Sequence, residues 1–167
     1  MYNGGAPELT GVLSLTPRVE LMFLGQYYHN IDEKGRLTIP ARYRELIQSD
    51  GAYLLQGFEN NLIILPSPYF DILSHRVNRT SFTDPTARAL RRLFFATASQ
   101  VDLDKLGRIL IPQFLRQHAG LDSEAVVAGL GHYFEIWSPT SWSSQIEQLR
   151  DTQQSADRFT ALDLLFE

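Results

Sequence analysis

The side chains that could carry chemistry are concentrated in a nine-residue stretch that the chain contains twice. The first copy reads Asp-Glu-Lys-Gly-Arg-Leu-Thr-Ile-Pro at residues 32–40, and 72 positions later the second reads Asp-Lys-Leu-Gly-Arg-Ile-Leu-Ile-Pro at residues 104–112. Neither copy contains a nucleophile with its base or a set of metal ligands. The guanidinium of arginine, however, is a planar fork of donors that suits phosphate oxygens or the edge of a guanine. The repeated stretch therefore indicates two sites that could bind a polyanion.

The same residue types also suit a purely structural role. An aspartate at the start of a turn accepts hydrogen bonds from backbone N–H groups, and a glycine supplies the positive φ that a tight turn requires. The arginine of each copy would then only pair with its aspartate, and an exposed pair of this kind contributes about 0–1 kcal/mol. The residues alone leave both the structural and the functional interpretation open.

Composition limits the class of protein. The chain has 167 residues, of which 44% are hydrophobic and 20% charged, as in globular proteins. It has no cysteine, which fits a reducing compartment, and its four histidines lack the spacing of metal ligands. Because no phosphate loop or nucleophile elbow is present, we expect no enzymatic activity, no cofactor, no metal and no small-molecule substrate. No apolar run approaches the roughly 20 residues of a membrane span, so we expect no membrane association and a cytoplasmic location.

Positive charge is local in this acidic chain. The formal net charge of −4 counts against a simple nucleic-acid binder. The first copy and the helix predicted after it nevertheless hold four cations, which are Lys34, Arg36, Arg42 and Arg44. A second group comprises Arg76, Arg79, Arg88, Arg91 and Arg92. We expect Arg42 and Arg44 to extend the first site, whereas the second group is either a phosphate-contacting face or the solvated side of a helix.

The pattern predicts the same order of elements around each copy: strand, turn, strand, helix, hairpin, helix. The elements expected in the first half are a strand–turn–strand unit over 22–39, a helix from Pro40 to about Gln48, a hairpin of 52–57 with 62–65, and a helix from Ser67 to about Val77. Shifting by 72 aligns Arg44 with Arg116 and residues 62–65 with 134–137, and a helix follows from Pro139 to about Leu149. Between the halves we expect one helix from Pro85 to about Ala98.

These elements predict an α+β fold of two tandem repeats. Each copy has about 50 residues, too few to bury a good core alone, so the two should pack together with pseudo-two-fold symmetry. The expected organisation is a disordered leader (1–21), a first repeat with its helix (22–78), a connecting helix (79–98), a second repeat with its helix (99–150) and a C-terminal tail (151–167). We expect the leader to be disordered because it is rich in Gly, Pro, Ser and Thr. Met22 opens the first regular apolar segment, and we take it as the natural start.

Residues 22–45 resemble the opening of the MraZ family, and residues 104–112 resemble that family's second repeat. The resemblance runs from Met22 to about Leu149 and includes Ala87–Phe94. It implies a bacterial transcriptional regulator, usually a repressor, built from two AbrB-like swapped-hairpin domains. Such proteins form homo-oligomeric rings in the nucleoid and bind double-stranded DNA at G-rich direct repeats upstream of the division and cell-wall gene cluster.

The resemblance also assigns the site residues. In the first DNA-binding motif it implies Asp32, Lys34 and Arg36, and in the second Asp104 and Arg108, with Lys105 in place of a lysine at position 106. AbrB-like folds also serve as antitoxins that bind a protein partner through a tail. The apolar end at residues 161–166 would carry that alternative.

Overall fold

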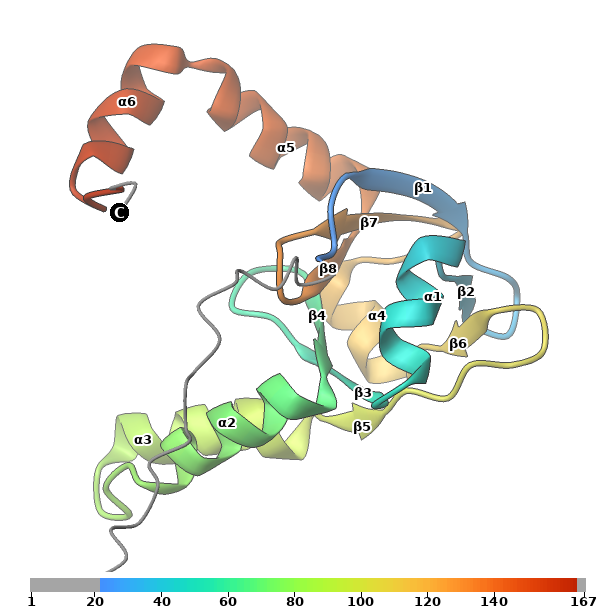
Figure 1. The fold of residues 1–167 in the computed structure, drawn as a ribbon, viewed down its shortest axis with the longest axis horizontal. Coiled ribbons are helices and arrows are strands. Elements are labelled where there is room, and N and C mark those ends of the chain that lie inside the picture. Colours follow the sequence, from blue (N-terminus) through green and yellow to red (C-terminus); the bar gives the residue numbers. More distant parts are fainter. Residues whose placement is uncertain (1–21, 165–167) are drawn as a thin grey trace, which may run out of the picture.

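The structure is a computed structural model that describes residues 22–164 (Figure 1). The expected leader (1–21) lies outside the described residues, as do residues 165–167. The strands are β1 (Gln26–Asn30), β2 (Arg36–Thr38), β3 (Ala52–Gln56), β4 (Leu62–Pro66), β5 (Ser99–Gln100), β6 (Arg108–Leu110), β7 (Glu124–Gly129) and β8 (Phe134–Trp137). The helices are α1 (Ala41–Gln48), α2 (Ser67–Asn78), α3 (Pro85–Arg91), the π-helix η1 (Arg92–Ala96), α4 (Gln113–Ala119), α5 (Pro139–Arg150) and α6 (Thr152–Thr160).

The two repeats exchange strands, so neither completes its own sheet. Six strands of the described chain form one antiparallel sheet in the order β1-β7-β8-β4-β3-β5. Strand β1 of the first repeat pairs with β7 of the second, and its counterpart β5 pairs with β3 of the first. The α+β class with two tandem repeats is thereby confirmed, and the exchange explains why about 50 residues suffice for each copy.

Strands β2 and β6 form a separate two-stranded ribbon on the pseudo-two-fold axis. Leu37 pairs with Ile109, its counterpart at an offset of 72. The ribbon continues beyond the strands, because the Ile39 N–H donates to the Gly107 carbonyl (3.0 Å) and the Ile111 N–H to the Gly35 carbonyl (2.9 Å). Each repeated motif is thus hydrogen-bonded to the other copy of itself.

Alternation along the strands divides the interior into two cores, as expected when successive side chains point to opposite faces of a sheet. Leu54 and Ile64 belong to the core under the ribbon and the helices α1 and α4, which also contains Leu37 and Tyr43. The other face of β3 and β4 packs against α2 and η1. Figure 1 shows the ribbon at one end of the molecule and the helices α2, α3, α5 and α6 toward the other.

Two expected elements differ in the structure. The helix predicted from Pro85 to Ala98 is α-helical only to Arg91 and continues as the π-helix η1. An apolar pattern cannot distinguish the wider turns of a π-helix, which here bury Phe94 to 4% exposure. The tail after Arg150 was expected only as a polar segment, yet it contains α6. The sequence of α6 is predominantly polar, so it lacks the apolar periodicity that predicts a helix. The Asp151 side chain caps α6 by accepting a hydrogen bond from the Gln154 N–H (3.0 Å).

We predict that the central pair of the ribbon supports the whole fold. Leu37 is 0% exposed, so Leu37→Ala should lower the free energy of unfolding by about 2–5 kcal/mol through lost burial and a residual cavity. Leu110 lies on the same ribbon but is 61% exposed, so Leu110→Ala should change it by less than about 0.5 kcal/mol. Urea denaturation at one protein concentration measures both. Equal effects of the two substitutions would contradict the central position of Leu37.

Candidate nucleic-acid interface

The first motif forms a tight turn that is organised by one carboxylate. Asp32 Oδ1 accepts from the backbone N–H groups of Lys34 (3.0 Å) and Arg36 (2.9 Å), and Oδ2 accepts from Arg36 Nε (2.7 Å). The Gly35 N–H donates to the Asp32 carbonyl (3.0 Å), with Gly35 at a φ of 82°. Asp32 therefore fixes both the backbone of the turn and the direction of the Arg36 side chain.

The second motif repeats this geometry. Asp104 Oδ1 accepts from the backbone N–H groups of Leu106 (2.9 Å) and Arg108 (2.9 Å), and Oδ2 accepts from Arg108 Nε (2.8 Å). The Gly107 N–H donates to the Asp104 carbonyl (3.0 Å). The structural role that the sequence suggested for the aspartates and glycines is thus present. The same contacts also hold each arginine in one orientation.

Both aspartates are ionised over a wide pH range. The pKa of Asp32 lies below its ordinary value, first because the Arg36 N–H donates to it and further because the Arg36 side chain pairs with it. The pKa of Asp104 is lowered in the same way by Arg108. A lowered carboxylate pKa gives stability that is present above the ordinary aspartate pKa and is lost as pH falls through the lowered value. Both turns therefore keep their carboxylate contacts at neutral and mildly acidic pH.

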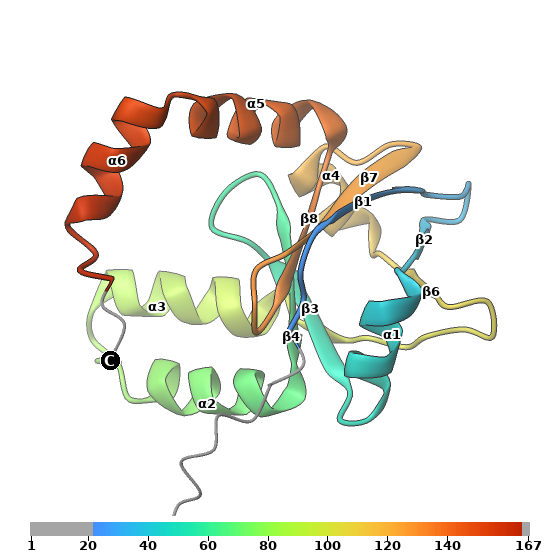
Figure 2. The same ribbon diagram turned by 45° about the horizontal axis from the view of Figure 1, so that its top comes forward.

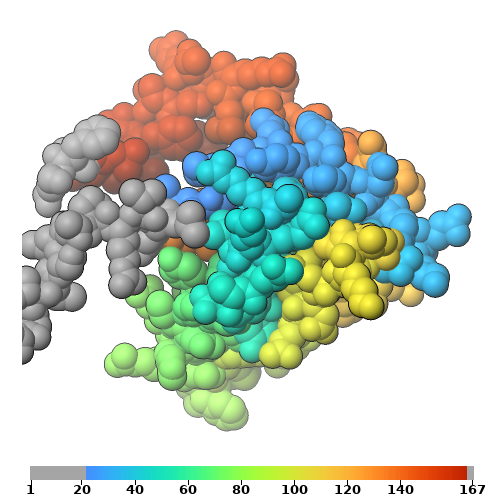
Figure 3. Space-filling model, turned by 45° about the vertical axis from the view of Figure 1, so that its right-hand side comes forward, coloured from blue at the N-terminus to red at the C-terminus, as the bar shows by residue number. Residues whose placement is uncertain are grey.

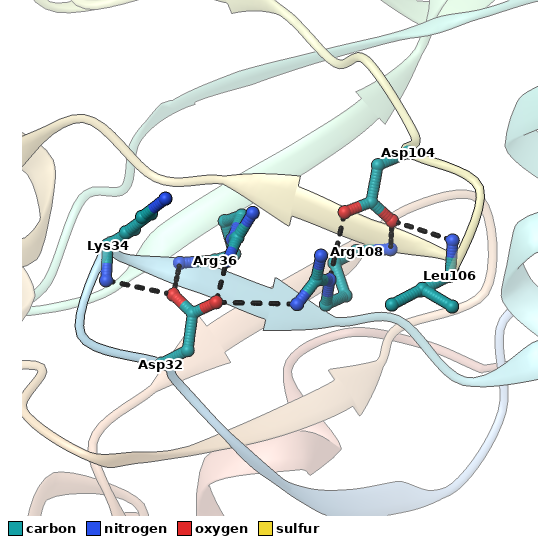
Figure 4. Close-up of polar contacts among 6 residues, drawn as sticks. All are labelled: Asp32, Lys34, Arg36, Asp104, Leu106 and Arg108. Atoms are coloured by element: carbon teal, nitrogen blue, oxygen red, sulfur yellow. Dashed lines mark hydrogen bonds and ion pairs between the residues drawn. The ribbon is translucent and has the colours of Figure 1, made fainter.

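The ribbon brings the two turns together on one face. Figure 4 shows the Asp–Arg pair of each turn beside the antiparallel strands β2 and β6, and Arg108 Nη1 reaches Asp32 Oδ2 across the ribbon (3.4 Å). The space-filling view shows the first turn and the segment that carries the second turn side by side on the surface (Figure 3). Among residues 22–164 no equivalent ion pair joins Arg36 to Asp104. The two turns thus form one surface, but they are not equivalent.

Arg44 of α1 and Arg116 of α4 pack against the backbone of the two turns. A Cβ placed on Gly35 would lie 2.5 Å from Cζ of Arg116, and one on Gly107 would lie 2.5 Å from Cδ of Arg44. Each helix arginine therefore packs directly on the turn glycine of the other repeat. Nε of both arginines is buried without a hydrogen-bond partner in the described chain. Each glycine is required both for its positive φ and for this close approach.

The exposed residues around the two turns differ in character. In the first half they include Lys34 and Arg42, which are both exposed. Their counterparts at an offset of 72 are Leu106 (66% exposed) and Phe114 (52% exposed). Leu110, with 61% of its surface exposed, stands where the first half has Thr38. Each half also keeps one exposed lysine in its turn, Lys34 in the first and Lys105 in the second, where the first half has the exposed Glu33. The second half therefore adds apolar side chains to a cationic turn, whereas the first half has Arg42 and Thr38 in their place.

The structure assembles six of the eight residues that the sequence suggested as a site. The turns hold Asp32, Lys34, Arg36, Asp104, Lys105 and Arg108. Arg42 is exposed on α1 without a hydrogen bond or ion pair to either turn within residues 22–164, and Arg44 lies beneath Gly107. Sequence reasoning did not include Arg116 in the site. The offset of 72, which aligns Arg116 with Arg44, is the signal that could have added it.

The second group of arginines lies elsewhere and shapes a different turn. Arg88 Nη1 donates to the Phe82 carbonyl (3.2 Å), and Arg91 Nη2 donates to the carbonyls of Asn78 (3.1 Å) and Thr80 (2.7 Å). These contacts hold the connection between α2 and α3. Arg88 and Arg91 thus have a structural role at the end of the molecule away from the ribbon.

The described residues offer little for other kinds of site. Within 22–164 no group of three or more His, Cys, Asp or Glu side chains could hold a metal ion. In the same part of the chain no helix combines the length and apolar character needed to span a membrane. His29, which lies near Arg44, has a pKa below its ordinary value because of burial and that positive charge.

Comparison with known proteins agrees with this architecture. A family model described as "MraZ protein, putative antitoxin-like" matches residues 22–93 and again residues 94–164. A protein named "Transcriptional regulator MraZ" from Herpetosiphon aurantiacus is 46% identical over 130 residues, which cover 78% of this chain and 90% of the relative. Relatives of the same name from Thermomicrobium roseum and Desulfitobacterium hafniense are 48% and 41% identical, covering 89% and 94% of their own lengths and 77% and 81% of this chain. The chain therefore belongs to the MraZ family.

Proposed function

We propose that this protein is a transcriptional regulator, acting as a repressor, which binds double-stranded DNA in a sequence-specific manner through the β2–β6 ribbon. The observation that carries the proposal is the pair of Asp-buttressed arginines fixed side by side on one exposed face. The name "Transcriptional regulator MraZ" borne by its relatives supports the same function. Its expected location is the cytoplasm, in association with the nucleoid.

The geometry of Arg36 suits recognition of guanine. Its Nε is occupied by Asp32, while neither Nη group has a hydrogen-bond partner within the described residues. Two parallel donors match the O6 and N7 acceptors that guanine presents in the major groove. Because Asp32 already restrains the side chain, less conformational entropy is lost on binding. Guanine-rich sites are therefore the DNA that this surface fits best.

A homo-oligomer would resolve the conflict between this function and the acidic chain. One copy offers only a small basic patch, built from Lys34, Arg36 and Arg42 in the first half and Lys105 and Arg108 in the second. A ring of copies would present the patch in series, and linked weak contacts can raise affinity by about 10²–10⁴ without new chemistry. Direct repeats with the spacing of neighbouring copies are the matching target. We place them upstream of the protein's own gene, in the division and cell-wall gene cluster.

The alternative is a partner-binding scaffold of the antitoxin type that acts through the C-terminal tail. It draws support from the exposure of Leu162 (63%) and Leu164 (79%). It gives no role to the paired arginines on the ribbon, which lie at the other end of the molecule (Figure 1). DNA is therefore the ligand that we propose for this surface.

We predict that the two turns contribute unequally to binding. Arg36→Ala should weaken binding to DNA from upstream of the gene by about 5- to 150-fold, equivalent to about 1–3 kcal/mol for a good bidentate contact. Arg108→Ala should weaken it less, because Nη1 of Arg108 already bonds Asp32 and the exposed residues beside it include Leu106 and Leu110. Fluorescence anisotropy at two salt concentrations measures both affinities, and circular dichroism verifies the fold.

A charge-matched control separates local contacts from general electrostatics. Arg76 is exposed on α2, away from the ribbon, so Arg76→Ala removes the same charge and should leave affinity nearly unchanged. If folded Arg36→Ala binds as tightly as the wild type, the turns are structural and the proposed function is wrong.

A second prediction concerns the arginines beneath the turns. Gly35→Ala should displace Arg116 and shift the first turn, so DNA binding should weaken. Gly131 has nearly the same φ (83° against 82°), but no atom lies within 4 Å of a Cβ placed there. Because alanine is strained at a positive φ, both substitutions should lower the free energy of unfolding by about 1–2 kcal/mol, as measured by thermal or urea denaturation. Only Gly35→Ala should lose affinity, and equal binding by the two variants would show that the packing of Arg116 is dispensable.

A further inference from the structure

Helix α5 lacks the cover that its counterpart α2 possesses. The two helices occupy equivalent positions, Ser67–Asn78 and Pro139–Arg150, at an offset of 72. Helix α2 buries Phe70 and Val77, whereas α5 buries none of its residues. Leu149, the counterpart of Val77, is 51% exposed. The pseudo-symmetry of the fold therefore breaks at α5.

The cover of α2 is the segment that follows it in the chain. Helices α3 and η1 return along α2, and Phe94 stacks on Phe70 with their ring centroids 4.9 Å apart. Phe94 is only 4% exposed, and Leu90 packs against the same cluster. This contact is what makes the α2 face an interior surface.

The chain contains a second copy of the covering segment. Residues 89–94 read Ala-Leu-Arg-Arg-Leu-Phe, and 72 positions later residues 161–166 read Ala-Leu-Asp-Leu-Leu-Phe. The two segments share alanine, both leucines and the terminal phenylalanine. Leu162, the counterpart of Leu90, is 63% exposed. The second copy is therefore present in sequence, and its described residues, 161–164, are all exposed.

The reason lies in the connection between the helices. In the first repeat residues 79–84 reverse the chain, Asp84 caps α3 by accepting from the Thr86 N–H (3.0 Å), and Arg91 holds the turn. In the second repeat a single residue, Asp151, separates α5 from α6. The positions equivalent to Asp84 and Arg91 are Ala156 and Asp163. Alanine has no side-chain oxygen to cap a helix, and an aspartate cannot donate to backbone carbonyls as Arg91 does. Helix α6 consequently begins at the end of α5 and, in Figure 2, turns down toward the far end of α3 instead of running back along α5.

The uncovered face of α5 adjoins a concave surface. One hollow of about 340 Å³ is lined by residues that include Trp137, Ser141 and Gln145. A second hollow of about 430 Å³ has a mostly apolar lining that includes Phe58 and Phe94, and both are lined by Glu59. In Figure 2 α5 and α3 face each other across this region, with α6 at its outer side. No residue of α6 lines either hollow.

We propose that residues 152–166 of one copy pack on α5 of a second copy, in the place that α3 and η1 occupy on α2. This exchange of an element between copies rests on the homo-oligomer of the proposed function and names the contact that builds it. The apolar face of the tail and the open face of α5 are different surfaces of one chain. A contact of this head-to-tail kind closes into a ring when its rotation permits.

The test uses the full chain and light scattering after size-exclusion chromatography. Leu149→Asp and Leu162→Asp each place a charge in the contact and should raise the midpoint concentration of assembly about tenfold or more. Both residues are exposed in the single copy, so its fold should survive. Gln148→Asp on α5 and Gln153→Asp on α6 are the matched controls, which should assemble as the wild type does.

Mixing identifies the partner surfaces. The Leu149→Asp variant keeps an intact tail and the Leu162→Asp variant keeps an intact α5, so an equimolar mixture should form a one-to-one dimer. Replacing residues 151–156 by the sequence of residues 79–84 keeps the offset of 72 and should let the tail cover its own α5 and give a monomer. A monomeric wild type, variants that still assemble, a mixture without dimer, or a replacement without effect would each overturn the proposal.

DNA binding is measured separately, so the two proposals fail separately. If the wild type assembles through its tail but binds no specific DNA, the proposed function falls and this contact stands. If Arg36→Ala abolishes DNA binding while both aspartate variants assemble normally, the contact falls and the proposed function stands.

Discussion

The antiparallel pairing of β2 with β6 is the constraint on which the rest of the structure depends. It joins each repeated motif to the other copy of itself, with Leu37 and Ile109 paired on the pseudo-two-fold axis. Because the ribbon crosses that axis, the flanking strands must continue into the opposite repeat, as β1 does when it pairs with β7. Strand exchange, a shared core and the proximity of the two turns therefore follow from one set of hydrogen bonds.

This arrangement also decides how the turns can act. Two sites on separate domains would vary in spacing, whereas here the Ile39 N–H bonds the Gly107 carbonyl and the Ile111 N–H bonds the Gly35 carbonyl. The packing of Arg44 under Gly107 and of Arg116 under Gly35 adds a second cross-repeat link. Movement of one turn must disturb the other. A rigid pair of arginines at one fixed separation suits a regular, repeating ligand better than an irregular one.

Much of this could be read from the sequence because the signals were local. Proline and capping residues marked the starts of α2, α3 and α5, and the repeated motif marked both turns. The exchange of β1 and β5 between repeats could not be read from the residues, since apolar alternation specifies a strand but not its partner, and only the resemblance to swapped-hairpin domains implied it. The contact of Arg116 with Gly35 joins residues far apart in the chain, and only the offset of 72, which aligns Arg116 with Arg44, pointed to it. Helix α6 was not predicted because its sequence is predominantly polar and Phe159 is its one large apolar residue.

The two repeats are similar in their buried residues and differ in their exposed residues. At the centre, Ile39 and Ile111 are identical counterparts and Leu37 and Ile109 are aliphatic counterparts. All four are at most 2% exposed, because close packing there requires apolar side chains. At the surface the counterparts diverge, as Lys34 and Leu106 do. Pairing constrains backbone and core equally in both copies but leaves outward side chains free. Duplication on a shared axis thus permits the outward side chains of the two halves to diverge without loss of the scaffold that holds them together.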